Sequence, residues 1–319
     1  METDSQSREA QAGRHGRRVR RYVRQSHPAR PGLIAALCSI TLVAGCGEDP
    51  AGPAVQIFAD SEHFHFQSTS ALATQAELDE GISRAEELWN AIGTFVGVGR
   101  LPNRRITVRL DGDKRDRNGG DHIDDRGVVH LLRRGPAFGG YFDALAHEIV
   151  HALRYDYWHQ YDSWSWPNFP FLDEGFAEFV AMQVDPAKTG FPYYWFNPDV
   201  VAGHWLARGE SIPPATLRDR HRELNTKCEH QAYPLRAYWL LYIEQSWGRQ
   251  AVLDIVYAEV PTTDEFIANV LGQDIEQVDD GWAAWLLSRY AAAPGADAEA
   301  EEFRSHFDGI YVCRVGTDF

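Results

Sequence analysis

The chain has 319 residues, of which 44% are hydrophobic and 12% aromatic, so it is neither disordered throughout nor collagen-like. The formal net charge of -15 argues against a protein that binds nucleic acid through phosphate contacts. Four cysteines are too few for a disulfide-rich scaffold, and the length allows one large domain or two smaller ones.

The first 45 residues have the composition of an export signal. They hold eight arginines and three acidic residues, a net of +5, which leaves a net of -20 for the remainder. An apolar run follows from Leu33 to Ala44, which is short of the ~20 residues that a transmembrane helix needs. The run ends in Ala44-Gly45-Cys46, and this ending resembles the lipobox of bacterial lipoproteins.

That resemblance implies that residues 1–45 are a lipoprotein signal peptide, cleaved before Cys46. Acyl chains on Cys46 would then anchor an exported protein, facing the periplasm or the cell exterior, without a membrane-spanning helix. The alternative is a generic signal peptide that a cysteine follows by chance.

Periodicity predicts the elements of the remaining chain. Residues 46–56 are rich in Gly, Pro and acidic residues, as in a flexible tether. Strands are predicted at 63–68, 105–110 and 128–132, and helices at 75–95, 141–157, 172–184, 230–247, 249–258, 263–271 and 275–290. We therefore expect an α+β fold with an α/β lobe over 57–160 and a mainly helical lobe over 161–319.

The segment His147-Glu-Ile-Val-His151 has the spacing of a metal site on a helix. Residues four apart lie on the same helix face, so both imidazoles can reach one metal ion. Glu148 lies beside them, where it can take a proton from a metal-bound water. Such a five-residue pattern is only suggestive when it stands alone.

A second segment supplies the third candidate ligand. Glu174 opens a helical pattern in Asp173-Glu174-Gly175-Phe176-Ala177, with 22 residues between it and His151. Two histidines and a glutamate suit zinc and leave a fourth position for water. At this point the chain resembles the gluzincin metallopeptidases, the group that includes thermolysin-like and aminopeptidase N-like enzymes. The spacing is wider than the aminopeptidase one, and the aromatic insert from Tyr155 to Phe171 can absorb the difference.

The resemblance assigns further roles. The segment Gln231-Ala-Tyr233 resembles the gluzincin helix whose tyrosine stabilises the oxyanion, although Tyr233 can also simply pack at a helix start. Glu178, one turn after Glu174, is the favoured partner to orient His147; Asp173 and Asp143 are weaker candidates, and each can be a surface acid. The strand at 128–132 corresponds to the edge strand that pairs with substrate in the resembling enzymes.

Two cysteines lie in the expected exported domain. Export permits disulfides, so Cys228 and Cys313 are predicted to pair, with two buried thiols as the alternative.

Together these observations predict a zinc metallopeptidase that acts on peptides or proteins, with a zinc-activated water and Glu148 as the general base. No element that grips a free amino terminus precedes the zinc helix, which favours an endopeptidase. Two alternatives stay open: a non-catalytic binding lipoprotein, and a zinc hydrolase of a non-peptide amide or ester. The sequence does not indicate an oligomeric state.

Overall fold

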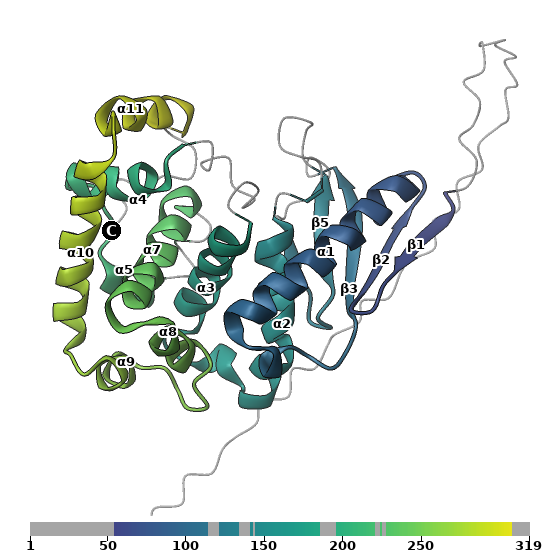
Figure 1. Ribbon diagram of the computed structural model, residues 1–319, viewed down its shortest axis with the longest axis horizontal. Coiled ribbons are helices and arrows are strands. Elements are labelled where there is room, and N and C mark those ends of the chain that lie inside the picture. Colours follow the sequence, from purple (N-terminus) through teal and green to yellow (C-terminus); the bar gives the residue numbers. More distant parts are fainter. Residues whose placement is uncertain are drawn as a thin grey trace, which may run out of the picture. The chain divides into compact units, whose positions relative to one another are not determined.

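A five-stranded mixed sheet is followed by a mostly helical part, which confirms the α+β class (Figure 1). The computed structural model describes residues 54–113, 121–133, 141–142, 144–185, 196–220, 224 and 228–307. All of these belong to one compact unit that begins at Ala51. The expected signal peptide lies outside the described residues.

The sheet has the strand order β1-β2-β3-β5-β4. Its strands are β1 (Gln56–Asp60), β2 (Phe64–Thr69), β3 (Ile106–Asp113), β4 (His122–Ile123) and β5 (Val129–Arg133). The three inner strands run parallel, and β1 and β4 pair antiparallel with them at the two edges. Side chains of β2 alternate between buried and less buried positions, whereas the first four residues of the inner strand β5 are all buried.

Two helices pack against the sheet. Helix α1 (Gln75–Val96) starts with a capping box between Thr74 and Glu77 and packs against β1 and β2. Helix α2 (Leu145–Tyr161) packs against β4 and β5. The contact between α1 and the sheet is close, because a Cβ on Gly81 would lie 2.7 Å from the ring of Phe66.

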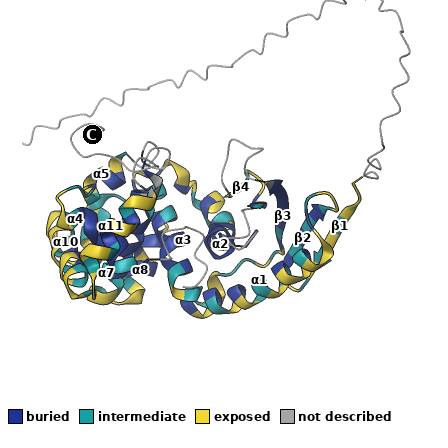
Figure 2. Cartoon of the chain, turned by 90° about the horizontal axis from the view of Figure 1, so that it is seen from above, coloured by how far each residue is buried: buried dark blue, intermediate teal, exposed yellow. Residues whose placement is uncertain are grey.

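The remaining elements are helical. They are η1 (Val98–Arg100), η4 (Ser163–Ser165), α3 (Phe169–Val184), α4 (Pro198–Ala207), α5 (Pro214–Asp219), α7 (Glu229–Trp247), α8 (Arg249–Val256), α9 (Asp264–Leu271), α10 (Ile275–Ala292) and α11 (Ala296–Phe307). Helix α3 contacts both α2 and α7, and buried residues dominate α2 and α3 (Figure 2). No described helix combines the length and the apolar character that crossing a membrane requires.

Two features differ from the sequence prediction. Strand β5 lies inside the sheet, between β3 and β4, so the expectation that 128–132 forms an edge strand is wrong. The edge belongs to β4, a strand of only two residues, which is too short to produce a detectable periodicity. Strand β1 and helices α4, α5 and α11 were also not predicted, since β1 is partly exposed along its whole length and the helices follow Pro- or Gly-containing segments.

Candidate metal centre

Helix α2 presents both histidines of the metal motif on one face. Leu145 and Ile149 anchor the helix in the core, and His147 and His151 are themselves buried. Their Nε2 atoms lie 3.0 Å apart, close enough for both nitrogens to bind one metal ion.

Helix α3 brings Glu174 to the same point. Its Oε2 lies 3.3 Å from Nε2 of His147 and 3.4 Å from Nε2 of His151. The reversal between the helices depends on Asp162, which ends α2 in the left-handed conformation with φ 48° and ψ 38°. Helix α2 continues to Tyr161, so ten of the residues between His151 and Glu174 belong to this helix. The chain then turns back toward α3 through η4.

Each histidine contacts a second carboxylate on its other nitrogen. Nδ1 of His147 lies 3.0 Å from Oε2 of Glu178, which is fully buried. Nδ1 of His151 lies 3.0 Å from Oδ2 of Asp173. Glu178 is hydrogen-bonded to His147, whereas Asp173 lies at ion-pair distance from His151 without hydrogen-bond geometry.

These carboxylates change the protonation of the metal-free site. Burial alone lowers the pKa of His147, but Glu174 and Glu178 outweigh this effect and raise that pKa to about 9. Burial likewise opposes the protonation of His151, whose pKa is nevertheless held well above its usual value by Asp173 and Glu174. Burial would raise the pKa of Glu174, but the two histidines keep it well below its usual value.

Glu148 lies on α2 between the two histidines in sequence and is 6% exposed. Burial raises the pKa of its carboxyl to about 7, partly against the opposing effect of the histidines. A carboxyl with a pKa near neutrality is suited to accept and return a proton at physiological pH.

The donor set fits a divalent metal ion. One atom each from His147, His151 and Glu174 lies within 4.8 Å of the others, and no other group of three or more potential ligands is found among the described residues. Because a carboxylate faces each Nδ1, each Nε2 is available to a metal, which is the arrangement usual for metal-binding histidines. Two imidazoles and one carboxylate suit zinc better than magnesium or calcium, which prefer oxygen alone. The Glu174 side chain is 21% exposed, so solvent reaches the site beside this residue.

Helix α7 places Tyr233 beside the two helices that carry the candidate ligands. The ring centroid of Tyr233 lies 5.8 Å from that of His147, and the guanidinium of Arg236 lies 5.8 Å from the same tyrosine ring. Close packing of α3 on α7 makes this possible, because a Cβ on Gly175 would meet the Cβ of Arg236 at 3.0 Å. The Tyr233 ring therefore lies beside that of His147, and its role stays a prediction.

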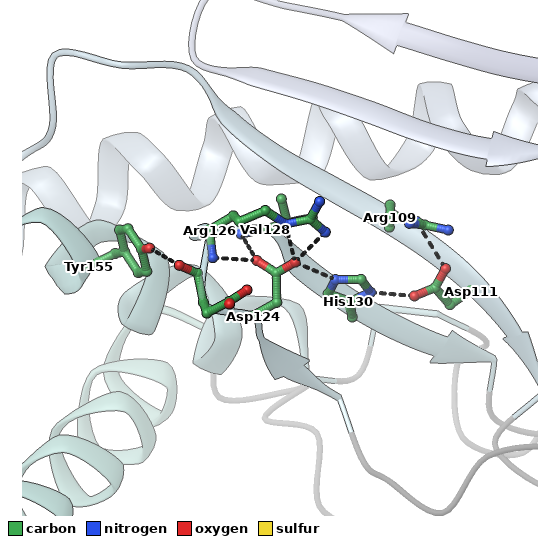
Figure 3. A network of polar contacts seen from close by, with 8 residues as sticks. Arg109, Asp111, Asp124, Arg126, Val128, His130 and Tyr155 are labelled. Carbon is green, nitrogen blue, oxygen red and sulfur yellow. Dashed lines mark hydrogen bonds and ion pairs between the residues drawn. The ribbon is translucent and has the colours of Figure 1, made fainter. Parts of the chain in front are cut away.

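The β4–β5 hairpin lies against α2 and is braced by a polar network (Figure 3). Asp124 accepts hydrogen bonds from the backbone N–H groups of Arg126 and Val128, at 2.9 and 3.0 Å. Burial would raise the pKa of Asp124, but these bonds and the Arg126 side chain hold it far below its usual value. His130 on β5 pairs with Asp111 on β3, and its other nitrogen lies 3.4 Å from Asp124.

A second contact joins the hairpin to the metal helix. The Tyr155 hydroxyl on α2 donates to the backbone carbonyl of Asp125. The hairpin is thus fixed both to the sheet and to the helix that carries the two histidines.

The aromatic insert packs largely on itself. Trp158 is 2% exposed, and its ring lies 5.2 Å from Trp164 and 5.5 Å from Phe169. It also lies 5.8 Å from the His151 ring, on the side of the metal site. Among these residues Trp164 is the exposed one, at 41%. These contacts are those of side chains that pack the loop rather than line an apolar pocket.

Several predicted sites lie outside the described residues. Cys46, Asp143 and Cys313 are among them, so the lipid anchor stays a prediction. Cys228 is buried and forms a disulfide, which excludes a free thiol at this position. The other three cysteines lie outside the described residues, and the pairing with Cys313 also stays a prediction.

In comparisons with known proteins, no protein-family model matches the chain, and no significant match to a curated protein is found. The functional argument therefore depends on the chemistry of the site.

Proposed function

We propose that this protein is a zinc-dependent hydrolase of the gluzincin type, and that its substrates are peptides or proteins. One observation carries the proposal: two buried imidazoles and one carboxylate converge from two helices, with a buried glutamate beside them. His147, His151 and Glu174 would hold the ion. When bound there, zinc supplies Lewis-acid chemistry that makes a water molecule nucleophilic near neutral pH.

In this proposal Glu148 moves the proton. Its carboxylate accepts the proton of the attacking water and returns it to the nitrogen of the leaving amine. Burial raises the pKa of this carboxyl in the metal-free site, which favours uptake of a proton. A purely binding protein would have no need of a buried carboxyl with these properties.

Tyr233 is the proposed oxyanion donor. Its ring lies against His147, on the helix that packs closest to α3. A phenol at this position would donate a hydrogen bond to the oxygen that becomes negatively charged as the carbonyl carbon is attacked. Loss of one such donor typically reduces kcat about 100-fold or more.

The location and specificity of the enzyme are also proposals. We infer a lipid anchor at Cys46 and action outside the cytoplasm from the signal-like leader. We favour internal cleavage of the substrate chain, since the sequence before the zinc helix contains no recognisable element for a free amino terminus.

The test combines metal analysis with a peptide-library cleavage assay of the mature protein. We expect about one zinc ion per chain and cleavage of internal peptide bonds. Glu148→Gln should keep the zinc and lose cleavage, because the amide cannot accept a proton. Tyr233→Phe should keep the zinc and retain a reduced rate.

The outcomes separate the alternatives. Zinc binding without cleavage of any peptide or ester would favour a binding lipoprotein. Cleavage of ester or non-peptide amide substrates alone would favour the other class of hydrolase. Wild-type turnover by Glu148→Gln would disprove the assignment of the base.

A further inference from the structure

Arg154 is a buried cation close to the proposed metal centre. It follows His151 by three residues on α2 and is 2% exposed. Arginine is seldom buried to this extent unless its charge is paired, because the loss of hydration is costly. The partners of Arg154 therefore indicate what the residue contributes.

The guanidinium of Arg154 joins three helices. Nη1 donates to Oδ1 of Asp173 on α3, and Nη2 donates to the backbone carbonyl of Val256 at 2.9 Å. Val256 is the last residue of α8, where the carbonyl has no partner within its own helix and carries the negative end of the helix dipole. A planar fork can satisfy both acceptors at once.

Three aromatic rings enclose the same guanidinium. Its Cζ lies 5.4 Å from the centroid of Phe176, 5.5 Å from Tyr257 and 5.8 Å from Trp158. These rings leave the side chain little freedom and favour the cation electrostatically. Arg154 is consequently held in place independently of any metal.

Asp173 connects this anchor to a metal ligand. One carboxylate oxygen accepts from Arg154, and the other lies 3.0 Å from Nδ1 of His151. The orientation of the His151 ring, and the nitrogen that it presents to Glu174, thus depend on a carboxylate that Arg154 holds.

We propose that Arg154 is a positioning residue for the metal centre. It fixes Asp173 by one oxygen, so that the negative charge of the other oxygen stays 3.0 Å from Nδ1 of His151 and favours the ring orientation in which Nε2 faces the ion. This inference rests on the proposed metal site, but it does not depend on which reaction the site catalyses.

Arg154→Lys tests the proposal without changing the charge of the buried cluster. A lysine cannot hold Asp173 and Val256 in a fixed fork, so Asp173 should lose its orientation. We expect the dissociation constant for zinc, measured by chelator competition, to rise about 10- to 100-fold, the usual effect of disturbing the partner of a metal-binding histidine. The absorption bands of the Co²⁺-substituted protein should shift, because the ligand geometry changes.

A double-mutant cycle separates positioning from general destabilisation. In an Asp173→Asn background, Arg154→Lys should have little further effect on zinc affinity, since its route to His151 is already broken. Arg218→Lys is the matched control, because Arg218 is also 2% exposed and pairs with a carboxylate, Asp279, between α5 and α10. It should lower the melting temperature without changing zinc affinity. Arg154→Gln is the second variant if Arg154→Lys does not fold, and the same loss of affinity is expected.

Two results would overturn the inference. One is a folded Arg154 variant with wild-type zinc affinity and an unchanged Co²⁺ spectrum. The other is an equal loss of affinity in both backgrounds of the cycle. If the wild-type protein bound no zinc, the proposed function itself would fail, whereas zinc binding that is insensitive to Arg154 would reject only the positioning role.

Discussion

In the absence of metal, the two histidines of the site are held by carboxylates on both sides. The carboxylates raise the pKa of His147 to about 9 and raise that of His151 as well, so this pair of rings takes up protons readily. The 3.0 Å contact between the two Nε2 atoms has room for one proton between them. A metal ion must displace these protons before it can bind. The acidic side chains that orient the ligands therefore also make the metal compete with protons.

This competition predicts that zinc affinity falls as the pH is lowered from about 9. Below the raised pKa, the metal-free site holds a proton that zinc must displace. Each displaced proton weakens zinc binding about tenfold for every pH unit below that pKa. Calorimetric titration in buffers of different ionisation enthalpy measures the protons released. Glu178→Gln removes one cause of the raised pKa and should shift the pH dependence of the remaining binding to lower pH. Affinity that stays constant between pH 6 and 9 would contradict this prediction.

Asp162 is the only non-glycine residue with positive φ in the part of the chain that the structure describes. Its backbone N–H donates to Trp158, and its carbonyl accepts from Ser165, so the turn is fixed on both sides. Asp162→Gly should be neutral or slightly stabilising, because glycine adopts this conformation freely. Asp162→Ala should cost about 1 kcal/mol, measured as a lower urea midpoint. Equal midpoints for the two variants would show that the turn relaxes.

At the scale of single residues, the sequence predicted the candidate metal ligands better than the side chains that contact those ligands. The spacing of His147 and His151 requires a shared helix face, so their convergence was predictable. Asp173 was only a weak candidate, because adjacency to Glu174 does not reveal which neighbouring helix a side chain will face. Arg154 gave no signal at all, since its role depends on the crossing of α2, α3 and α8.

Among the elements, α3 determines the geometry of the site. It carries Glu174 and both orienting carboxylates, and it packs between α2 and α7. Glycine at 175 allows the approach of α7, because any side chain there would meet Arg236. The distance between α3 and α7 thus also sets the distance between Glu174 and Tyr233.

Gly175→Ala should push α7 away from α3. A Cβ at 3.0 Å from the Arg236 side chain and 3.4 Å from its backbone leaves little room for adjustment. We expect a loss of about 1–3 kcal/mol in unfolding free energy, together with a lower kcat as Tyr233 moves. Gly99→Ala is the control, because that position has open space around it and should be neutral. An unchanged kcat would indicate that α7 tolerates the extra carbon without moving Tyr233.

Long amphipathic helices and the inner strands were predictable from periodicity alone. Helix α1 matches its predicted range closely because its apolar residues recur at helical spacing along its length. Strand β4 could not be predicted, since two residues form a strand only through their pairing with β5. The order of the strands was likewise hidden, because pairing depends on contacts between distant segments.

At the scale of the whole molecule, one buried histidine in the helical half, His204, is expected to make the stability of the fold depend on pH. His204 on α4 is completely buried against Trp205 and Phe303, and its Nδ1 donates to the carbonyls of Val200 and Val201. Burial lowers its pKa to about 4. The unfolded chain, with a histidine pKa near 6.5, therefore takes up this proton at a higher pH than the folded protein.

Stability should consequently fall as the pH drops from about 6.5 to 4. His204 contributes up to about 3 kcal/mol of this loss, because protons favour the unfolded state throughout that range. His204→Gln should flatten the pH dependence of the urea midpoint in metal-free protein. His306→Gln, at an exposed position on α11, should leave it unchanged. Parallel curves for wild type and His204→Gln would reject the assignment.

The fold class follows from composition and periodicity, but the joining of its two halves does not. The sequence separated a strand-containing half from a helical half without indicating how they pack. In the structure, α2 and α3 meet at that junction, and the ligands come from both.

The candidate ligands are close together in the chain as well as in space. All three lie on the adjacent helices α2 and α3, and only 22 residues separate His151 from Glu174. Closing so short a loop has a small entropic cost, and contacts that are local in sequence form early in folding. The two helices can therefore meet before the distant strands have found their partners, and a metal ion held by the three candidate ligands would stabilise that early contact.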